Sequence, residues 1–328
     1  MLAVVFQDGG YRLEEVKRPS LSQEEALVRV LAAGICSTDF ELLQGYHRFQ
    51  GTPGHEFAGL VVEAPNAPQL VGQRIVADIN CGCGSCSFCL AGDPHHCPER
   101  TVIGIKGRNG AFAEYLAVPL SSLLPVPESL SDREAVFAEP LAAALQITQQ
   151  LTIRHRDRIA VLGDGKLGLL AAMGLRRYSG QVHLLGRHRS SLDLAEEQGV
   201  KTACLLRDQP FVEQIQHLEP FDLVLEATGK PEGLSQALSL VRPRGTVAVK
   251  TTTAQAVPVD VSRIVVHEIR LLGSRCGDPA QALDLLSQGG IEVSKLITAE
   301  YALSDFPAAW ERAAEPGAGK VLLRCFKA

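Results

Sequence analysis

Short hydrophobic runs that alternate with polar residues, glycine and proline dominate the first part of the chain, up to about residue 136. Successive side chains of a β-strand face opposite sides of a sheet, so this alternation indicates strands with one buried face. Turn-forming residues separate the runs at short intervals, which favours an antiparallel arrangement. We therefore predict a loop-rich antiparallel β domain. Its strands include Ala26–Leu31, Leu60–Val62, Arg74–Ala77 and Phe112–Val118.

From about residue 137 to 279 the pattern changes, because apolar strands now alternate with amphipathic helices. Such alternation is typical of βαβ units, in which parallel strands form a sheet covered by helices. The predicted strands are Arg158–Leu162, Val182–Leu185, Asp222–Glu226, Thr246–Lys250 and Ile269–Gly273. The predicted helices between the first four strands are Lys166–Tyr178, Arg189–Gln198 and Glu232–Val241. A helix and the strand Lys320–Cys325 follow from about residue 280, so the chain is predicted to belong to the α/β class.

The composition is that of a folded protein, and it excludes several function classes. A length of 328 residues suggests about two domains, and 46% hydrophobic with 21% charged residues excludes wholesale disorder. The formal net charge is −5, and without a basic stripe we expect no nucleic-acid partner. No apolar run approaches the roughly 20 residues of a membrane-spanning helix. The N-terminal segment does not resemble a secretory signal, so we expect a cytoplasmic protein with no membrane partner.

Nine cysteines are present, and five of them fall within the seventeen residues from Cys81 to Cys97. Cytosolic proteins rarely keep disulfides, and an odd number of cysteines does not suit a fully paired framework, so the cluster indicates a metal site. Four thiolates in one loop are typical of a closed structural zinc site. The predicted ligands are Cys83, Cys86, Cys89 and Cys97. Cys81 is a spare thiol, and reduced cysteines without metal are the alternative interpretation.

The strand Arg158–Leu162 leads directly into a Gly-x-Gly-x-x-Gly sequence, and a predicted helix follows. In this context Gly163 permits a tight turn, Gly165 lets the backbone approach a pyrophosphate, and Gly168 lets helix and strand pack closely. The helix N-terminus offers free N–H groups and a partial positive charge to the phosphates. We predict a dinucleotide site, with a tight turn that binds nothing as the alternative. The predicted cofactor-binding residues of the turn are Gly163, Gly165, Lys166, Leu167 and Gly168.

The residues after the second predicted strand of this region bear on the choice of cofactor. Sites selective for NAD carry Asp or Glu about 20 residues past the glycines, where the acid binds the ribose 2′-hydroxyl. Here Gly186 occupies that place and is expected to leave space, Arg187 follows it, and no acid occurs before Asp193. Because arginine can meet a phosphate with paired charge-assisted hydrogen bonds, this pattern predicts that NADP(H) is preferred over NAD(H). The alternative is that Arg187 and Arg189 are solvated residues at the start of a helix.

A second set of possible metal ligands is spread along the chain and comprises Cys36, His55, Glu56 and Glu139. Cysteine, histidine and carboxylate form the mixed ligand set of catalytic zinc, which keeps one position for water or substrate. Taken singly, Cys36 could be a buried apolar residue, His55 a core histidine and Glu139 a charge at a helix start. Their occurrence together with the cysteine loop and the glycine turn favours a catalytic metal site.

In these motifs the chain resembles the zinc-dependent medium-chain dehydrogenase/reductase family, which includes alcohol, polyol and threonine dehydrogenases. The resemblance covers nearly the whole chain and keeps the order of the motifs. These are Cys36-Ser37-Thr38-Asp39, the Gly-His-Glu-x-x-Gly run of Gly54–Gly59, the cysteine loop, Asn109–Tyr115, Glu139-Pro140 and the glycine turn. The resemblance implies a GroES-like β-rich catalytic domain of residues 1–136, completed by 280–328, and a Rossmann doubly wound parallel-sheet domain of residues 137–279. It also implies a homodimer or homotetramer in which the strand Ile269–Gly273 pairs across a two-fold axis.

The resemblance further implies the ligands of a catalytic zinc, so that two zinc ions are expected per chain. Cys36 and His55 resemble the fixed ligands. Either Glu56 or Glu139 is the third, with the other carboxylate nearby or bound through water. The Glu139-Pro140 pair is more similar to the threonine, sorbitol and glucose dehydrogenase branches than to the ethanol-type enzymes, which have a cysteine in place of this carboxylate.

Two residues near Cys36 resemble residues with set roles in the family, and a third departs from it. Asp39 resembles the acid that orients the zinc-bound histidine. Thr38 resembles the hydroxyl that hydrogen-bonds the substrate oxygen and starts a proton relay. Glu41 stands where many relatives have a histidine at the outer end of that relay. The catalytic residues expected on this basis are Thr38, Asp39 and Glu56.

The chemistry that follows from the resemblance is hydride transfer between a nicotinamide cofactor and a small alcohol or polyol, or in reverse its aldehyde or ketone. A zinc-ribbon module that binds nucleic acid is a rival hypothesis, but it leaves Cys36, His55 and the glycine turn unexplained. A family member that binds cofactor without a dehydrogenase role is the nearer alternative, and the intact set of zinc ligands argues against it.

Overall fold

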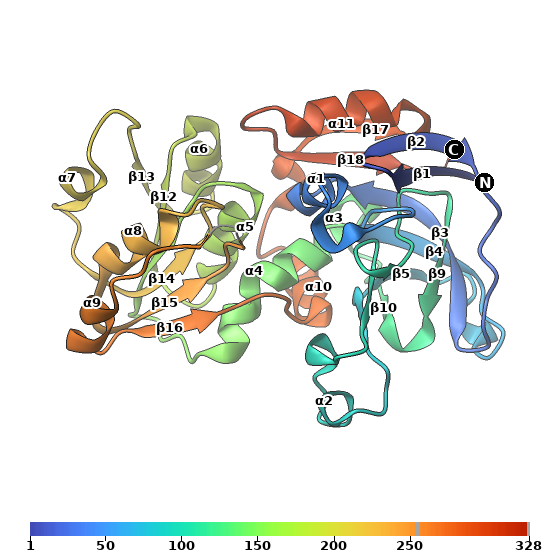
Figure 1. Cartoon of the computed structure of the whole chain (residues 1–328), viewed down its shortest axis with the longest axis horizontal. Helices are drawn as coiled ribbons and strands as arrows, with labels where there is room; N and C mark the ends of the chain where they lie inside the picture. The colour runs from blue at the N-terminus through green and yellow to red at the C-terminus, as the bar shows by residue number, and fades with distance from the viewer. Residues whose placement is uncertain (253–255, 327–328) are drawn as a thin grey trace. The chain divides into compact units, whose positions relative to one another are not determined.

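The structure is a computed structural model that describes residues 1–252 and 256–326 (Figure 1). The chain divides into two compact units. Unit 1 consists of Met1–Glu139 together with Asp278–Ala328, and unit 2 consists of Pro140–Gly277. Two separate stretches of chain therefore build unit 1, and the stretch between them builds unit 2.

The main sheet of unit 1 has seven strands, and both stretches of chain contribute to it. Its order is β10-β5-β4-β3-β18-β17, and β9 also pairs with β3. The strands are β3 (Glu25–Gly34), β4 (Glu56–Glu63), β5 (Arg74–Ala77), β9 (Tyr115–Pro119), β10 (Leu123–Pro125), β17 (Ile297–Ala302) and β18 (Lys320–Arg324). β18 is antiparallel to β3, and Leu322 lies opposite Gly34. The second stretch thus extends the sheet that the first stretch begins.

Aromatic residues from both stretches form part of the core of unit 1. β1 (Leu2–Gln7) and β2 (Gly10–Glu15) make an antiparallel hairpin that carries Phe6 and Tyr11. α11 (Phe306–Ala314) carries Phe306 and Trp310. The rings of Phe6 and Trp310 meet edge to face with centroids 5.6 Å apart, and those of Tyr11 and Phe306 are 5.0 Å apart. Such pairs add to the free energy gained by burial, so they stabilise the association of the two stretches.

Smaller elements complete unit 1. They are α1 (Ser37–Leu43), β6 (Asn80–Cys81), α2 (Ser87–Leu90), β7 (Thr101–Ile103), β8 (Gly107–Arg108), α3 (Asp132–Ala135) and α10 (Pro279–Ser287). The predicted strand Phe112–Val118 is shorter than expected, because Phe112 and Ala113 make isolated backbone contacts to β1 and Pro53 and the ladder with β3 begins at Tyr115.

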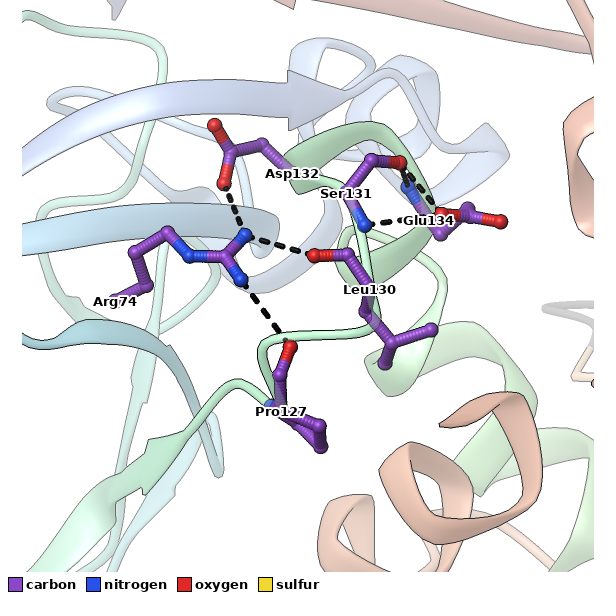
Figure 2. A network of polar contacts seen from close by, with 6 residues as sticks. All are labelled: Arg74, Pro127, Leu130, Ser131, Asp132 and Glu134. Carbon is purple, nitrogen blue, oxygen red and sulfur yellow. Dashed lines mark hydrogen bonds and ion pairs between the residues drawn. The ribbon is translucent and has the colours of Figure 1, made fainter. Parts of the chain in front are cut away.

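Arg74 of β5 anchors the segment that leads to the helix carrying Glu139 (Figure 2). Its guanidinium donates to the carbonyl oxygens of Leu130 at 2.8 Å and Pro127 at 3.1 Å, and to the Asp132 carboxylate at 3.0 Å. Ser131 caps α3 through a reciprocal capping box with Glu134. Two backbone carbonyls and a helix start are thereby satisfied, which fixes the course of residues 127–134.

Unit 2 contains a parallel sheet of six strands in the order β13-β12-β11-β14-β15-β16. This is the 3-2-1-4-5-6 order of dinucleotide-binding sheets. The strands are β11 (Arg158–Leu162), β12 (Gln181–Gly186), β13 (Lys201–Cys204), β14 (Phe221–Glu226), β15 (Val241–Val249) and β16 (Arg270–Gly273). The helices are α4 (Ala138–Gln150), α5 (Lys166–Leu175), α6 (Arg189–Glu197), α7 (Phe211–Ile215), α8 (Gly233–Leu240) and α9 (Val261–Val266).

The sequence pattern missed β13, α4, α7 and α9 and misplaced some boundaries. β13 is a short edge strand, and none of its four residues is buried, so it lacks the apolar run that marks the other strands. β15 begins at Val241 rather than Thr246, and its early residues Arg242 and Arg244 are exposed. α5 ends at Leu175 rather than Tyr178, because the N–H groups of Arg177 and Tyr178 bond three residues back, to Gly174 and Leu175. None of the helices in residues 1–252 and 256–326 is both long and apolar enough to span a membrane.

Candidate metal centres and cofactor-binding turn

Cys36, His55 and Glu56 come together in unit 1. Cys36 is the residue before the first turn of α1, His55 precedes β4, and Glu56 is the first residue of β4. One donor atom from each of the three lies within 4.8 Å of the other two. His55 and Glu56 are 3% and 1% exposed. Cys36 is half-buried. A set of one sulfur, one nitrogen and one carboxylate oxygen, two of them on buried residues, fits the donor chemistry of a catalytic zinc site.

Asp39 holds two of these residues in place. It lies on α1 and is completely buried. One carboxylate oxygen accepts the N–H of Cys36 at 2.8 Å, and the other lies 3.4 Å from Nδ1 of His55. Burial lowers the pKa of His55, but the Asp39 carboxylate outweighs burial and raises that pKa well above its ordinary value. Asp39 is therefore placed to fix the orientation of the imidazole and the position of the thiolate.

Glu56 of this cluster also forms a buried ion pair that the sequence analysis missed. Nζ of Lys320, the first residue of β18, donates to Oε2 of Glu56, and their side chains are 2% and 1% exposed. Burial lowers the pKa of Lys320, but Glu56 and Cys36 outweigh burial and raise it. Gly34 of β3 makes the pair possible, because a Cβ there would meet the Glu56 carboxylate and the stem of Lys320.

Glu139 lies near the cluster without belonging to it. It is the second residue of α4, and the Cys36–His55–Glu56 cluster does not include it. Burial raises the pKa of Glu139 to about 7; His55 opposes this rise and the negative charge of Glu56 adds to it. The two candidate third ligands thus differ in this structure. Glu56 belongs to the cluster and is paired with Lys320. Glu139 is a second buried carboxyl near the cluster.

Thr38 and Glu41 lie on α1 close to Cys36. They are three residues apart, which puts them on one face of the helix. Thr38 is half-buried and Glu41 is exposed. Desolvation raises the pKa of the Glu41 carboxyl. The helix therefore presents a hydroxyl and then a carboxyl in the direction away from Cys36.

The four cysteines of the predicted structural site also come together. One sulfur from each of Cys83, Cys86, Cys89 and Cys97 lies within 4.8 Å of the others. The N–H of Cys83 donates to the sulfur of Cys97, and that of Cys86 to the sulfur of Cys83, each at 3.4 Å. Hydrogen bonds from Ser85 and Cys86 lower the pKa of Cys83 to about 6. Four converging sulfurs, one of them biased toward thiolate, fit a closed tetrahedral zinc site.

Cys81 is not part of that site. Its side chain is buried, accepts a hydrogen bond from the Ser122 hydroxyl at 3.7 Å, and contacts the carbonyl of Ile79 at 3.8 Å. Burial raises the pKa of its thiol. Cys81 is thus a core residue at the end of β6, just before the cysteine loop.

The glycine turn joins β11 to α5 in unit 2. Gly163 has φ +111°, in the left-handed region that favours glycine, and Gly168 packs so closely that a Cβ would collide with the Gly163 carbonyl oxygen. A Cβ at Gly165, the residue before α5, would meet no other atom within 4 Å. The backbone ahead of α5 is therefore open at Gly165, as a bound phosphate requires. Lys166 and Leu167 form the first turn of α5.

The end of β12 differs from the sequence-based expectation. Gly186 leaves no empty space, because the Asp164 side chain of the glycine turn fills the volume that a side chain at 186 would occupy. Asp164 accepts hydrogen bonds from the backbone N–H groups of Arg187 and His188. The end of β12 has no acid of its own, but Asp164 of the glycine turn after β11 places a carboxylate there. The side chain of Arg187 is exposed.

Comparison with known proteins decides the family. Residues 22–128 match the profile of the alcohol dehydrogenase GroES-like domain, and residues 167–288 match that of the zinc-binding dehydrogenases. The sorbitol dehydrogenase of Halalkalibacterium halodurans is 30% identical, over 96% of this chain and 96% of its own length. The chain belongs to the zinc-dependent medium-chain dehydrogenase family.

Other relatives agree with membership of this dehydrogenase family. The L-threonine 3-dehydrogenase of Streptomyces coelicolor is 31% identical over 96% of each chain. A protein of Sinorhizobium meliloti 1021, described as a zinc-binding dehydrogenase bound to NADP, has a TM-score of 0.90 and 32% identity over 98% of each chain. The alcohol dehydrogenase rspB of Escherichia coli CFT073, complexed with NADH, has a TM-score of 0.92 and 26% identity over 99% of each chain. The predicted family and the predicted GroES-like and Rossmann folds are confirmed.

Two residues of this dehydrogenase escaped sequence analysis. Lys320 could have been noticed as a lysine at the head of the apolar run Val321–Leu323, but nothing local indicates its partner. Asp164 lies between two glycines of the dinucleotide motif, and only the fold shows that its side chain reaches Gly186 at the end of β12. Both residues contact partners that are distant in the sequence.

Proposed function

We propose that the chain is a zinc-dependent, nicotinamide-linked dehydrogenase that oxidises a small alcohol or polyol, or reduces the corresponding aldehyde or ketone. Family membership supports an oxidoreductase that acts on alcohols. The observation that carries the proposal is the cluster of half-buried Cys36 with buried His55 and Glu56, next to the Asp39 carboxylate. The names of the relatives favour polyols and amino alcohols as the substrate class.

Cys36 and His55 would hold the catalytic zinc, with Glu56 as the third donor because it belongs to the cluster. When bound, zinc supplies Lewis-acid chemistry that lowers the pKa of an alcohol hydroxyl. Asp39 keeps the imidazole and the thiolate in position. The Thr38 hydroxyl accepts the substrate proton, and Glu41, on the same face of α1, takes the proton at the solvent side. Glu139 would supply a second buried carboxyl beside the zinc site.

The test is a dehydrogenase assay on the zinc-loaded protein with panels of polyols, amino alcohols and sugars, followed by the absorbance of the reduced cofactor. We expect turnover with at least one panel and its loss in Cys36→Ser and His55→Ala, both of which should still bind nicotinamide cofactor. Glu56→Gln and Glu139→Gln, compared for zinc content, decide the third ligand. The proposal fails if cofactor binds but no alcohol or carbonyl compound is turned over.

We also propose a second, structural zinc held by Cys83, Cys86, Cys89 and Cys97. Metal analysis should give two zinc ions per chain. Cys89→Ser should remove one of them and lower thermal stability, because a loop without its own core depends on the metal for folding. A wild-type content of one zinc would contradict this proposal.

NADP(H) is the proposed preferred cofactor, because Arg187 is exposed beside the end of β12 and can meet a 2′-phosphate. We expect kcat/KM to favour NADP(H), and Arg187→Ala to shift that ratio toward NAD(H). A wild type that uses NAD(H) equally well would defeat this part of the proposal.

The proposed assembly is a homodimer or homotetramer that pairs at β16. β16 is an edge strand of its sheet, and Leu271 on it is exposed. On the neighbouring α9, Val261, Val265 and Val266 are between 64% and 74% exposed. An apolar face beside an unpaired strand edge is a typical self-association surface. Light scattering at micromolar concentration should give at least a dimer. A cytoplasmic location, also proposed, can be checked by cell fractionation.

A further inference from the structure

The carboxylate of Asp164 occupies the place in which NAD-selective sites carry an acid at the end of the second strand. Asp164 is only 7% exposed. A Cβ built on Gly186 would collide with its Cβ, Cγ and Oδ2 atoms. A variant such as Gly186→Asp therefore has no room for its side chain. The acid that selects the ribose in other dinucleotide sites has an equivalent here that comes from the glycine turn after β11.

Asp164 also occupies the hydrogen-bond donors at this point of the fold. Its Oδ2 accepts the backbone N–H of Arg187 at 2.8 Å and that of His188 at 2.5 Å. Its Oδ1 lies 3.1 Å from Nδ1 of His188. His188 is the residue before the first turn of α6, where free N–H groups commonly bind phosphates. These two N–H groups are already paired with a carboxylate and cannot bind a phosphate.

Arg187 is the cationic side chain next to these two N–H groups. Arg187 is exposed, and no side-chain partner for it is seen among residues 1–252 and 256–326. Arg189, two residues later, is paired with Asp193 at 2.7 Å and Glu196 at 3.2 Å on its own helix. Arg187 is therefore the cation available to a 2′-phosphate, and the negative charge of Asp164 lies beside it.

We propose that Asp164 is a specificity-determining residue that disfavours the 2′-phosphate, so that Asp164 and Arg187 act in opposition and together set the choice between NAD(H) and NADP(H). Asp164 repels the phosphate and withholds two backbone donors, whereas Arg187 attracts it. The preference for NADP(H) is thus smaller than Arg187 alone would produce. This inference rests on the proposed nicotinamide-linked function.

The experiment compares the affinities of adenosine 2′,5′-bisphosphate and adenosine 5′-monophosphate by calorimetry, because the two differ only in the 2′-phosphate and need no turnover. In Asp164→Asn, the bisphosphate should gain roughly tenfold over the monophosphate relative to wild type, equivalent to about 1.4 kcal/mol. In Arg187→Ala, the bisphosphate should bind more weakly than the monophosphate, because the carboxylate then acts unopposed. The double variant should bind both about equally.

Asp222→Asn is the matched control. It removes the same charge from unit 2 at the start of β14, where Asp222 bonds to Arg158 and Arg242, and it should leave the affinity ratio unchanged. An unmoved ratio in Asp164→Asn overturns the proposal, as does an equal loss of both nucleotides. If Asp164→Asn does not fold, the proposal is decided by Arg187→Ala, and equal binding of the two nucleotides there overturns it. A wild type that binds neither nucleotide refutes the nicotinamide-linked function itself.

Discussion

Removing Lys320 should leave the Glu56 carboxylate buried without its partner, and the cost of that change can be worked out from the structure. Both side chains are at most 2% exposed, so neither can recover its hydration when the other is removed. Breaking a buried ion pair in this way typically costs about 3–5 kcal/mol. Lys320→Met keeps most of the side-chain volume beside Gly34, so the predicted loss is mainly electrostatic.

The single tryptophan of the chain makes the assay specific to unit 1. Trp310 lies on α11 and packs against Phe6 and Phe40. Its fluorescence during urea unfolding therefore reports on the unit that contains Lys320. With a slope of about 2 kcal/mol per molar urea, the predicted loss lowers the midpoint by about 1.5–2.5 M. The measurement uses zinc-stripped protein, because a bound zinc ion would itself neutralise Glu56, and the zinc content of each variant is determined beside it.

Two further variants separate the buried charge from other effects. Lys295→Met breaks an exposed pair with Glu292 in the same unit and should cost less than about 1 kcal/mol. Adding Glu56→Gln to Lys320→Met removes the unpaired charge and should restore at least about 1 kcal/mol. The reasoning is refuted if Lys320→Met is no more destabilised than Lys295→Met, or if the double variant is no more stable than Lys320→Met.

Three other predictions concern the metal sites and their support. Asp39→Asn should weaken zinc binding by about 10- to 100-fold, and competition with a chelator that shows wild-type affinity would contradict the role of this carboxylate. Arg74→Ala leaves two backbone carbonyls without their donor and should lower the free energy of unfolding by about 1–3 kcal/mol in the same urea titration, with Arg74→Lys intermediate. In zinc-stripped protein, the thiolate of Cys83 should form as pH rises through about 6, so its alkylation, followed by peptide mass spectrometry, should have its midpoint there. Cys325 should stay unmodified over that range because burial raises its pKa; early labelling of Cys325, or a Cys83 midpoint near the ordinary thiol value, would count against this prediction.

Features that depend on neighbours in the sequence could be predicted well. The turn from Gly163 to Gly168 and the spacing of the four cysteines each specify their geometry within one short segment. The parallel sheet was predictable because its central strands are continuous apolar runs, whereas β13, a short edge strand without buried residues, carries no such pattern. Boundaries such as the start of β15 depend on which strand pairs with which, and periodicity does not contain that information.

Contacts between distant segments could not be predicted from local pattern. Lys320 meets Glu56 only because β18 pairs with β3, and β3 pairs with β4. Asp164 fills the space at Gly186 only because β11 and β12 are adjacent and parallel. In both cases the residue type was visible, but the partner was set by the topology. The sequence pattern pointed to an absent acid at the end of β12, and the fold supplies one from elsewhere.

The place of β18 in the sheet has a consequence for the order in which the protein matures. β18 is synthesised after all of unit 2, yet it lies between β3 and β17 and carries the lysine that neutralises Glu56. On a ribosome, unit 2 can complete its fold from one continuous segment while β3 of unit 1 still lacks its neighbour β18. Until β18 arrives, the end of β3 from Ala32 to Gly34 lacks a partner on that side, and Glu56 lacks the charge of Lys320. Nascent chains should therefore fold unit 2 first and complete the metal site of unit 1 last. The chain should depend most on chaperones between these two events.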